Sequence, residues 1–77
     1  MKTIFENETI KISETGRNYD FIAIIENKTD NIVKIEYQNE YIESIITIYS
    51  NDWIGILADE DGYAILDSLR NNNFKIL

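Results

Sequence analysis

The chain has 77 residues, 44% of them hydrophobic, and its 14 acidic and 7 basic side chains give a formal net charge of −7. This length and apolar content predict one small folded domain over residues 1–77 and argue against disorder. The acidity disfavours direct binding to nucleic acid or to an anionic membrane, because both need a cationic surface on the protein.

The sequence contains no cysteine, which excludes disulfides and thiolate metal sites and favours an intracellular setting. No apolar run approaches the roughly 20 residues that cross a bilayer, and the first ten residues contain no secretory core. We therefore expect a cytoplasmic protein. The net charge has two interpretations, solubility and recognition of a basic surface, and both stay open at this point.

Alternating apolar and polar residues predict the first strands. Ile10 and Ile12 alternate with polar neighbours, which is typical of a half-buried strand. Ile4 and Phe5 either extend this strand or form a separate short edge piece. Residues 21–25 are nearly all apolar, which predicts a central strand covered on both faces.

A third strand follows after a polar turn. Val33, Ile35 and Tyr37 should point to one side of it, and Lys34 and Glu36 to the other. The alternation predicts a strand with one face on the core.

Residues 41–50 fit two interpretations. Their apolar members recur at helical spacing, but residues 45–49, with the sequence IITIY, are dense in β-branched and aromatic types. We predict a strand here.

The stretch from Trp53 to Leu57 predicts a buried strand, in which Gly55 permits a close backbone approach. The carboxylates of residues 59–61 suit a helix start, because they accept hydrogen bonds from its free N–H groups and favour its positive end. Residues 65–69 then carry a helical apolar stripe.

We therefore predict one helix between about Glu60 and Asn72, followed by asparagines that tolerate a left-handed exit. The apolar residues of the tail, 74–77, predict a last edge strand. Together the elements predict an α+β fold, an antiparallel meander of four or five strands with one C-terminal helix packed on one face. The expected core residues are Ile22, Ile24, Ile56, Leu66 and Leu69, joined by Ile65.

One acidic segment, Asp59 to Gly62, resembles part of a calcium-binding loop. Placing Gly62 at the sixth position of an EF-hand loop puts Leu57 first and Ser68 last, where oxygen ligands and a closing glutamate are required. The match fails, and we expect neither a metal nor another cofactor.

Catalysis is also disfavoured. The chain has no histidine and no cysteine, so the commonest general base and the strongest nucleophile are absent. Its three glycines form no phosphate-binding loop. We expect no catalytic residues and no enzyme activity.

Aromatic residues on the predicted strands have three interpretations: a stacking platform for single-stranded nucleic acid, cross-strand packing, or a protein interface. A stacking platform needs lysine and arginine beside the rings, and few are near. We favour cross-strand packing for the set as a whole. Some of the tyrosines could instead lie at a protein interface. The residues are Tyr19, Tyr37, Tyr41, Tyr49 and Trp53.

These exclusions favour a non-enzymatic acidic module that binds a protein, acting as an inhibitor that occupies its basic, nucleic-acid-binding surface. Carboxylates two residues apart on a strand, such as those of Glu6 and Glu8, stand roughly 6.5–7 Å apart, close to the phosphate spacing of a nucleic-acid strand. In size, charge and compactness the chain resembles small phage-encoded inhibitors such as anti-CRISPR proteins. The resemblance is one of class and involves no shared motif.

Two acidic groups are the predicted contact residues. They are Glu36, Glu40 and Glu43 around the third turn, with Tyr37 and Tyr41 as anchors, and Asp59, Glu60, Asp61 and Asp67 around the helix start. One alternative is a structural or self-associating protein, which includes a homodimer. A weaker alternative is a binder of single-stranded nucleic acid.

Overall fold

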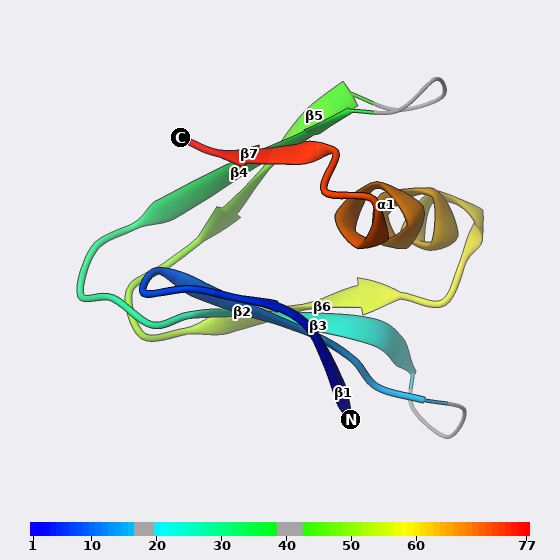
Figure 1. Ribbon diagram of the computed structural model, residues 1–77, viewed down its shortest axis with the longest axis horizontal. Helices are drawn as coiled ribbons and strands as arrows, with labels where there is room; N and C mark the ends of the chain where they lie inside the picture. The colour runs from blue at the N-terminus through cyan, green and yellow to red at the C-terminus, as the bar shows by residue number, and fades with distance from the viewer. Residues whose placement is uncertain (17–19, 39–42) are drawn as a thin grey trace.

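The computed structural model describes residues 1–16, 20–38 and 43–77. Within these ranges the chain forms seven strands in two antiparallel sheets and one helix, so the expected α+β class is confirmed (Figure 1). The elements are β1 Lys2–Glu6, β2 Ile10–Glu14, β3 Phe21–Asn27, β4 Val33–Gln38, β5 Glu43–Ile48, β6 Trp53–Leu57, α1 Glu60–Arg70 and β7 Phe74–Ile76.

The strands exceed the expected four or five because both short apolar pieces form strands of their own. The piece around Ile4 and Phe5 is β1, which pairs with β2, and the tail is β7, which pairs with β4. Residues 43–48 form β5, so the strand interpretation of that region is right, although residues 41 and 42 lie outside the described ranges.

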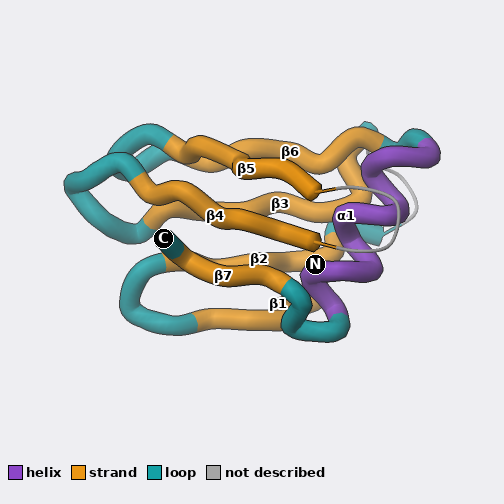
Figure 2. Tube along the Cα trace, turned by 90° about the horizontal axis from the view of Figure 1, so that it is seen from above, coloured by secondary structure: helices purple, strands orange, loops and turns teal. Residues whose placement is uncertain are grey.

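The first sheet has the strand order β1-β2-β3-β6, and the second has the order β5-β4-β7. The chain passes from the first sheet to the second between β3 and β4, returns between β5 and β6, and passes over again through α1. The sheets therefore stack face to face, with α1 lying across one end of the stack (Figures 1 and 2).

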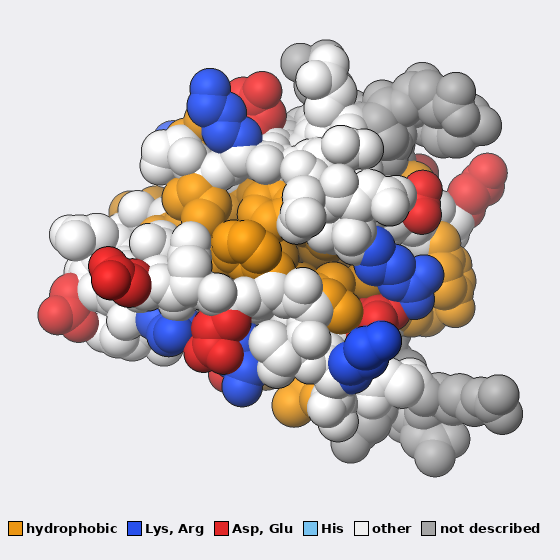
Figure 3. All heavy atoms as spheres, viewed as in Figure 1, with side chains coloured by type: hydrophobic (Ala, Val, Ile, Leu, Met, Phe, Trp, Pro, Cys, Tyr) orange, Lys and Arg blue, Asp and Glu red, His pale blue; other side chains and the backbone are white. Residues whose placement is uncertain are grey.

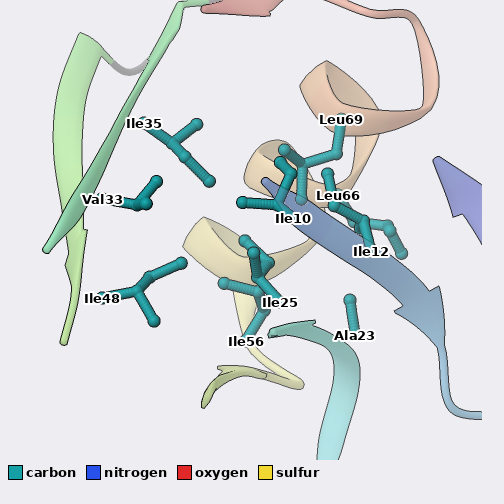
Figure 4. Close-up of a cluster of buried hydrophobic side chains, with 10 residues drawn as sticks. All are labelled: Ile10, Ile12, Ala23, Ile25, Val33, Ile35, Ile48, Ile56, Leu66 and Leu69. Atoms are coloured by element: carbon teal, nitrogen blue, oxygen red, sulfur yellow. The ribbon is translucent and has the colours of Figure 1, made fainter. Parts of the chain in front are cut away.

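The core lies between the two sheets and under α1 (Figure 4). Val33 and Ile35 face inward from β4 as their alternation predicts, and so do Ile10 and Ile12 from β2. On one side of the stack, the Phe5 ring of β1 meets Phe74 of β7 edge-on, with 5.1 Å between ring centroids. The buried cluster consists of Ile10, Ile12, Ala23, Ile25, Val33, Ile35, Ile48, Ile56, Leu66 and Leu69.

The predicted core needs a correction in β3. Ala23 and Ile25 are its buried apolar residues, whereas Ile22 and Ile24 are only partly buried. Strand side chains alternate between faces, and only the inner face of the first sheet is covered by the second sheet. The expectation that β3 is covered on both faces was therefore wrong.

The helix begins where the carboxylates predict. Asp59 is its N-cap and accepts a hydrogen bond from the Gly62 N–H at 2.7 Å. A Cβ atom at Gly62 would overlap the carbonyl oxygen of Leu57, so this close turn into the helix requires glycine. At the other end, Asn72 has a φ of 56°, which is the predicted left-handed exit.

The apolar stripe of α1 faces the core, where Leu66 and Leu69 have only 3% and 1% of their surfaces exposed. Ile56 of β6 is buried in the same cluster. Ile65 is partly buried at the edge of the cluster. The helix part of the predicted core is confirmed.

Candidate protein-binding surface

The carboxylates near the helix start divide into one structural residue and three exposed ones. Asp59 serves as the N-cap, so its side chain holds the helix in place. Glu60 and Asp61 occupy the exposed first turn, where they favour the positive end of the helix dipole. Asp67 is exposed further along α1. These three carboxylates are free to meet a partner.

The other predicted group, around the end of β4, is only partly described. Glu36 is half-buried on β4, with Lys75 of β7 opposite it in the register. Tyr37 points inward and has 6% of its surface exposed, so it is a core residue and we remove it from the contact surface. Glu40, Tyr41 and the side chain of Glu43 lie outside the described part of the chain.

The fold brings the elements that carry the two groups to one end of the molecule. The end of β4, the start of β5 and the whole of α1 lie together at the end opposite the β3–β4 turn (Figures 1 and 2). Elements that are distant in sequence, and that carry described members of both groups, therefore share one region.

The charges are distributed unevenly along the chain. Residues 35–69 contain eight acidic residues and no lysine or arginine, whereas the rest of the chain contains six acidic and seven basic residues. The first segment carries −8 and the remainder +1, so the whole net charge of −7 comes from residues 35–69. This pattern is visible in the sequence itself.

Acids and bases are interspersed on the side where β1 and β7 form the sheet edges (Figure 3). The Lys28 ammonium lies 3.0 Å from the carboxylate of Glu6, and Arg70 donates to Glu14. Across the first sheet, Lys11 stands in register with both Glu6 and Glu26. These neighbours largely cancel the field on this side.

The hydrogen bond from Lys28 is the main reason why the pKa of the Glu6 carboxyl is lowered, and the positive charge of Lys28 adds to it. Glu6 is therefore engaged with its own chain. The expectation that Glu6 and Glu8 stand two residues apart on one strand was wrong, because β1 ends at Glu6 and Glu8 lies in the turn before β2. The phosphate-like spacing predicted for this pair therefore does not follow.

The opposite side of the stack is formed by the edges of β5 and β6, which both lie in the segment without cations. We expected β6 to be a buried strand, but 50% of the Trp53 surface and 56% of the Leu57 surface are exposed. Ile45 and Tyr49 are also more than half exposed. The exposed apolar side chains of the two strands point away from the core, those of Trp53 and Leu57 from the first sheet and those of Ile45 and Tyr49 from the second.

Gly55 lies between the two exposed residues of β6. The ring of Phe21, from β3, occupies the place where a Cβ atom at Gly55 would lie. The same ring meets Trp53 edge-on, with 5.9 Å between centroids. The close approach that Gly55 permits is therefore that of an aromatic ring, which also contacts Trp53, and not that of another backbone.

Other kinds of site find little support among the described residues. They contain no group of three acidic residues placed to hold a metal ion, and no described helix is long and apolar enough to cross a membrane. A shallow hollow lies between α1 and the start of β1, but its Arg70 is already paired with Glu14. None of the predicted contact residues lines it.

No protein-family model, curated protein or solved structure matches this chain.

Proposed function

We propose that this protein is a non-enzymatic binding module that recognises a basic surface of another protein in the cytoplasm. By occupying such a surface it would act as an inhibitor wherever that surface normally binds nucleic acid. The observation that best supports the proposal is that the net charge is confined to residues 35–69, while the charges elsewhere neighbour one another.

Segregation of the charge is more informative than its total. Solubility requires only a net charge away from zero, which an even distribution supplies. Like charges in close succession, as at Asp59, Glu60 and Asp61 around the helix start, cost electrostatic energy, and they produce a local field that attracts and orients a basic partner. This uneven distribution supports the proposal of recognition over solubility alone.

Two charge-reversal variants with equal net charge test the proposal. The first carries Glu60→Lys and Asp67→Lys on α1, and the second carries Glu8→Lys and Asp30→Lys at turns on the opposite end of the molecule. A partner captured from a cell lysate by the wild-type chain is purified, and its association rate is measured against salt concentration. Thermal unfolding of both variants checks that they are folded.

We expect the α1 variant to associate roughly 3–10-fold more slowly than the wild type and with a flatter salt dependence, because steering depends on the local field. The turn variant should stay close to the wild type. If the two variants behave alike, or if salt has no effect on either, recognition by the acidic segment is refuted and the charge serves solubility.

Self-association is a second candidate, and the exposed Trp53 and Leu57 on an edge strand favour it. Salt separates the two functions. A complex with a basic protein weakens as salt rises, whereas self-association of an acidic chain strengthens because its like charges are screened. Sedimentation velocity of the isolated protein at low and high salt measures the second effect.

A further inference from the structure

The described sheets have four edge strands, and they differ in how well they are protected against pairing with another chain. β1 carries Lys2 and an irregular register between Thr3 and Phe5, and β7 has only three residues, with Lys75 at its centre. β5 begins with Glu43. β6, with the sequence WIGIL, has no charged residue and no proline. Lysine and bulges are usual means of blocking a sheet edge. β6 has no lysine, and the irregularity in its pairing with β3, between Phe21 and Ala23, adds the extra residue to β3 and leaves β6 itself regular.

The register shows which backbone groups of β6 face outward. The Asn27 N–H donates to the carbonyl of Asp52 at 2.8 Å, and the Ala58 N–H donates to the carbonyl of Asp20 at 3.3 Å, so Asp52 and Ala58 direct these groups toward the β3 side. Because pairs alternate in an antiparallel ladder, Ile54 and Ile56 direct their backbone groups toward β3. The backbone groups of Trp53, Gly55 and Leu57 point to the open edge.

Two of these outward groups already have partners. The Trp53 N–H donates to the side chain of Asp52 at 2.8 Å, and the Leu57 carbonyl accepts from the Asp59 N–H at 2.9 Å. Within the described part of the chain, the remaining outward groups have no partner: the Trp53 carbonyl, both groups of Gly55 and the Leu57 N–H. Gly55 therefore offers both a donor and an acceptor to a further strand. The Trp53 carbonyl adds an acceptor on one side of it, and the Leu57 N–H adds a donor on the other.

The charges around β6 indicate what can pair with it. Asp52 precedes the strand, and Asp59, Glu60 and Asp61 follow it. A second copy that paired β6 with β6 in the antiparallel sense would bring Asp52 of each copy beside the three acids of the other. That arrangement is repulsive, whereas lysine or arginine on the added strand would be attracted from both ends.

We propose that the outer edge of β6 pairs with an extended, lysine- or arginine-rich segment of the partner protein, which becomes a fifth strand of the first sheet. This inference rests on the proposed function and specifies how the basic partner is held. Backbone hydrogen bonds supply affinity in such strand addition, and side-chain contacts supply specificity. The half-exposed ring of Trp53, with Glu26 opposite it in the register, is suited to a cation on the added strand.

The chain has a single tryptophan, so its fluorescence reports on this edge alone. The probe is an eight-residue peptide of alternating lysine and valine with blocked ends. Two controls match it: the same peptide methylated on its backbone nitrogens, and a peptide in which glutamate replaces lysine. Hydrogen exchange of single amides is followed by NMR, with Ile54 and Ile56 as internal references that already face β3.

We expect saturable changes in Trp53 emission with the lysine peptide and slower exchange of the Gly55 and Leu57 amides, with no change at Ile54 or Ile56. Methylation should weaken binding roughly tenfold or more, since two or more hydrogen bonds are lost. The glutamate peptide should not bind.

Other outcomes overturn the inference in distinguishable ways. If the lysine peptide binds equally well when methylated and leaves Gly55 and Leu57 unprotected, strand pairing is wrong while recognition of basic chains survives. If the glutamate peptide binds as well, the edge does not select for charge. If Gly55 becomes protected with rising concentration of the protein alone, the occupant is a second copy. Absence of binding by the lysine peptide also refutes the pairing, and the proposed function is then decided separately by its two charge variants.

Discussion

The side-chain amide of Asn27 donates a hydrogen bond to the main-chain carbonyl of Ile48, 3.1 Å away. Asn27 ends β3 in the first sheet and Ile48 ends β5 in the second. The same amide also reaches the carbonyls of Asn31 and Tyr49, and its oxygen accepts from the Thr29 N–H at 2.9 Å. One buried side chain, 3% exposed, thus ties together the two turns at which the chain changes sheets.

Replacing Asn27 by alanine should destabilise the protein by about 2–4 kcal/mol, because several buried carbonyl and N–H groups lose their partner at once. Urea unfolding measures the loss. Asn31→Ala is the matched control, since Asn31 contributes its backbone carbonyl to this network and its side chain is exposed. A loss below about 1 kcal/mol for Asn27→Ala would show that water replaces these hydrogen bonds without cost.

Leu69→Ala should cost about 2–5 kcal/mol, since this side chain is 1% exposed and its removal leaves a cavity between α1 and the sheets. Tyr63→Ala on the same helix removes a side chain that is 58% exposed and should change stability by less than about 1 kcal/mol. The two free energies of unfolding are compared under identical conditions. Equal losses would mean that α1 packs through a different face.

Gly55→Ala should destabilise the fold by about 1–3 kcal/mol, because the new methyl group must displace the ring of Phe21. The displacement should also alter the emission of Trp53, which the same ring contacts. Combining Gly55→Ala with Phe21→Ala tests the cause. The two losses should be clearly less than additive, since the methyl group no longer meets a ring. Strict additivity would rule out the steric explanation.

Lys28→Met should raise the pKa of Glu6 toward its usual value, because the hydrogen bond and the charge that lower it are removed. In the wild type, the lowered pKa means that the ionised carboxyl favours the folded state. This contribution is complete above the pKa of the unfolded chain and is lost as pH falls through the lowered pKa of the folded state. An NMR titration of the Glu6 carboxyl measures both values. An unchanged pKa in Lys28→Met would contradict the assigned cause.

Periodicity explains where prediction from the sequence succeeded. Val33 and Ile35 alternate with polar residues, and Leu66 and Leu69 lie on a helical stripe beside a capping aspartate, so their elements and buried faces could be foreseen. The uniformly apolar β3 gave no such signal. Nothing in its sequence distinguishes the inward Ile25 from the outward Ile24.

The candidate surface was predicted less completely than the fold. Glu60 and Asp61 are exposed as expected, because they lie in the first turn of α1. Asp67 is also exposed, but it lies further along α1 than the helix start where it was expected, outside the apolar stripe of Leu66 and Leu69. Two incompatible predictions were made for Tyr37, one as a contact residue and one as a residue on the same strand face as Val33. Its spacing from Val33 favoured the core, where the structure places it. Trp53 was assigned to a buried strand, since composition alone does not reveal that β6 is at an edge of its sheet.

The pairing of β4 with both β5 and β7 has a consequence for the order in which the protein folds. β4 and β5 are neighbours in the sequence and form a hairpin. β4 and β7, which pair Ile35 with Ile76, are separated in the sequence by β5, β6 and α1. Pairing across such a long intervening segment must overcome a larger loop-closure entropy before any contact is gained. We therefore expect the hairpins to form early in refolding and the docking of β7 to be late, so that the contact between Phe5 and Phe74 appears last.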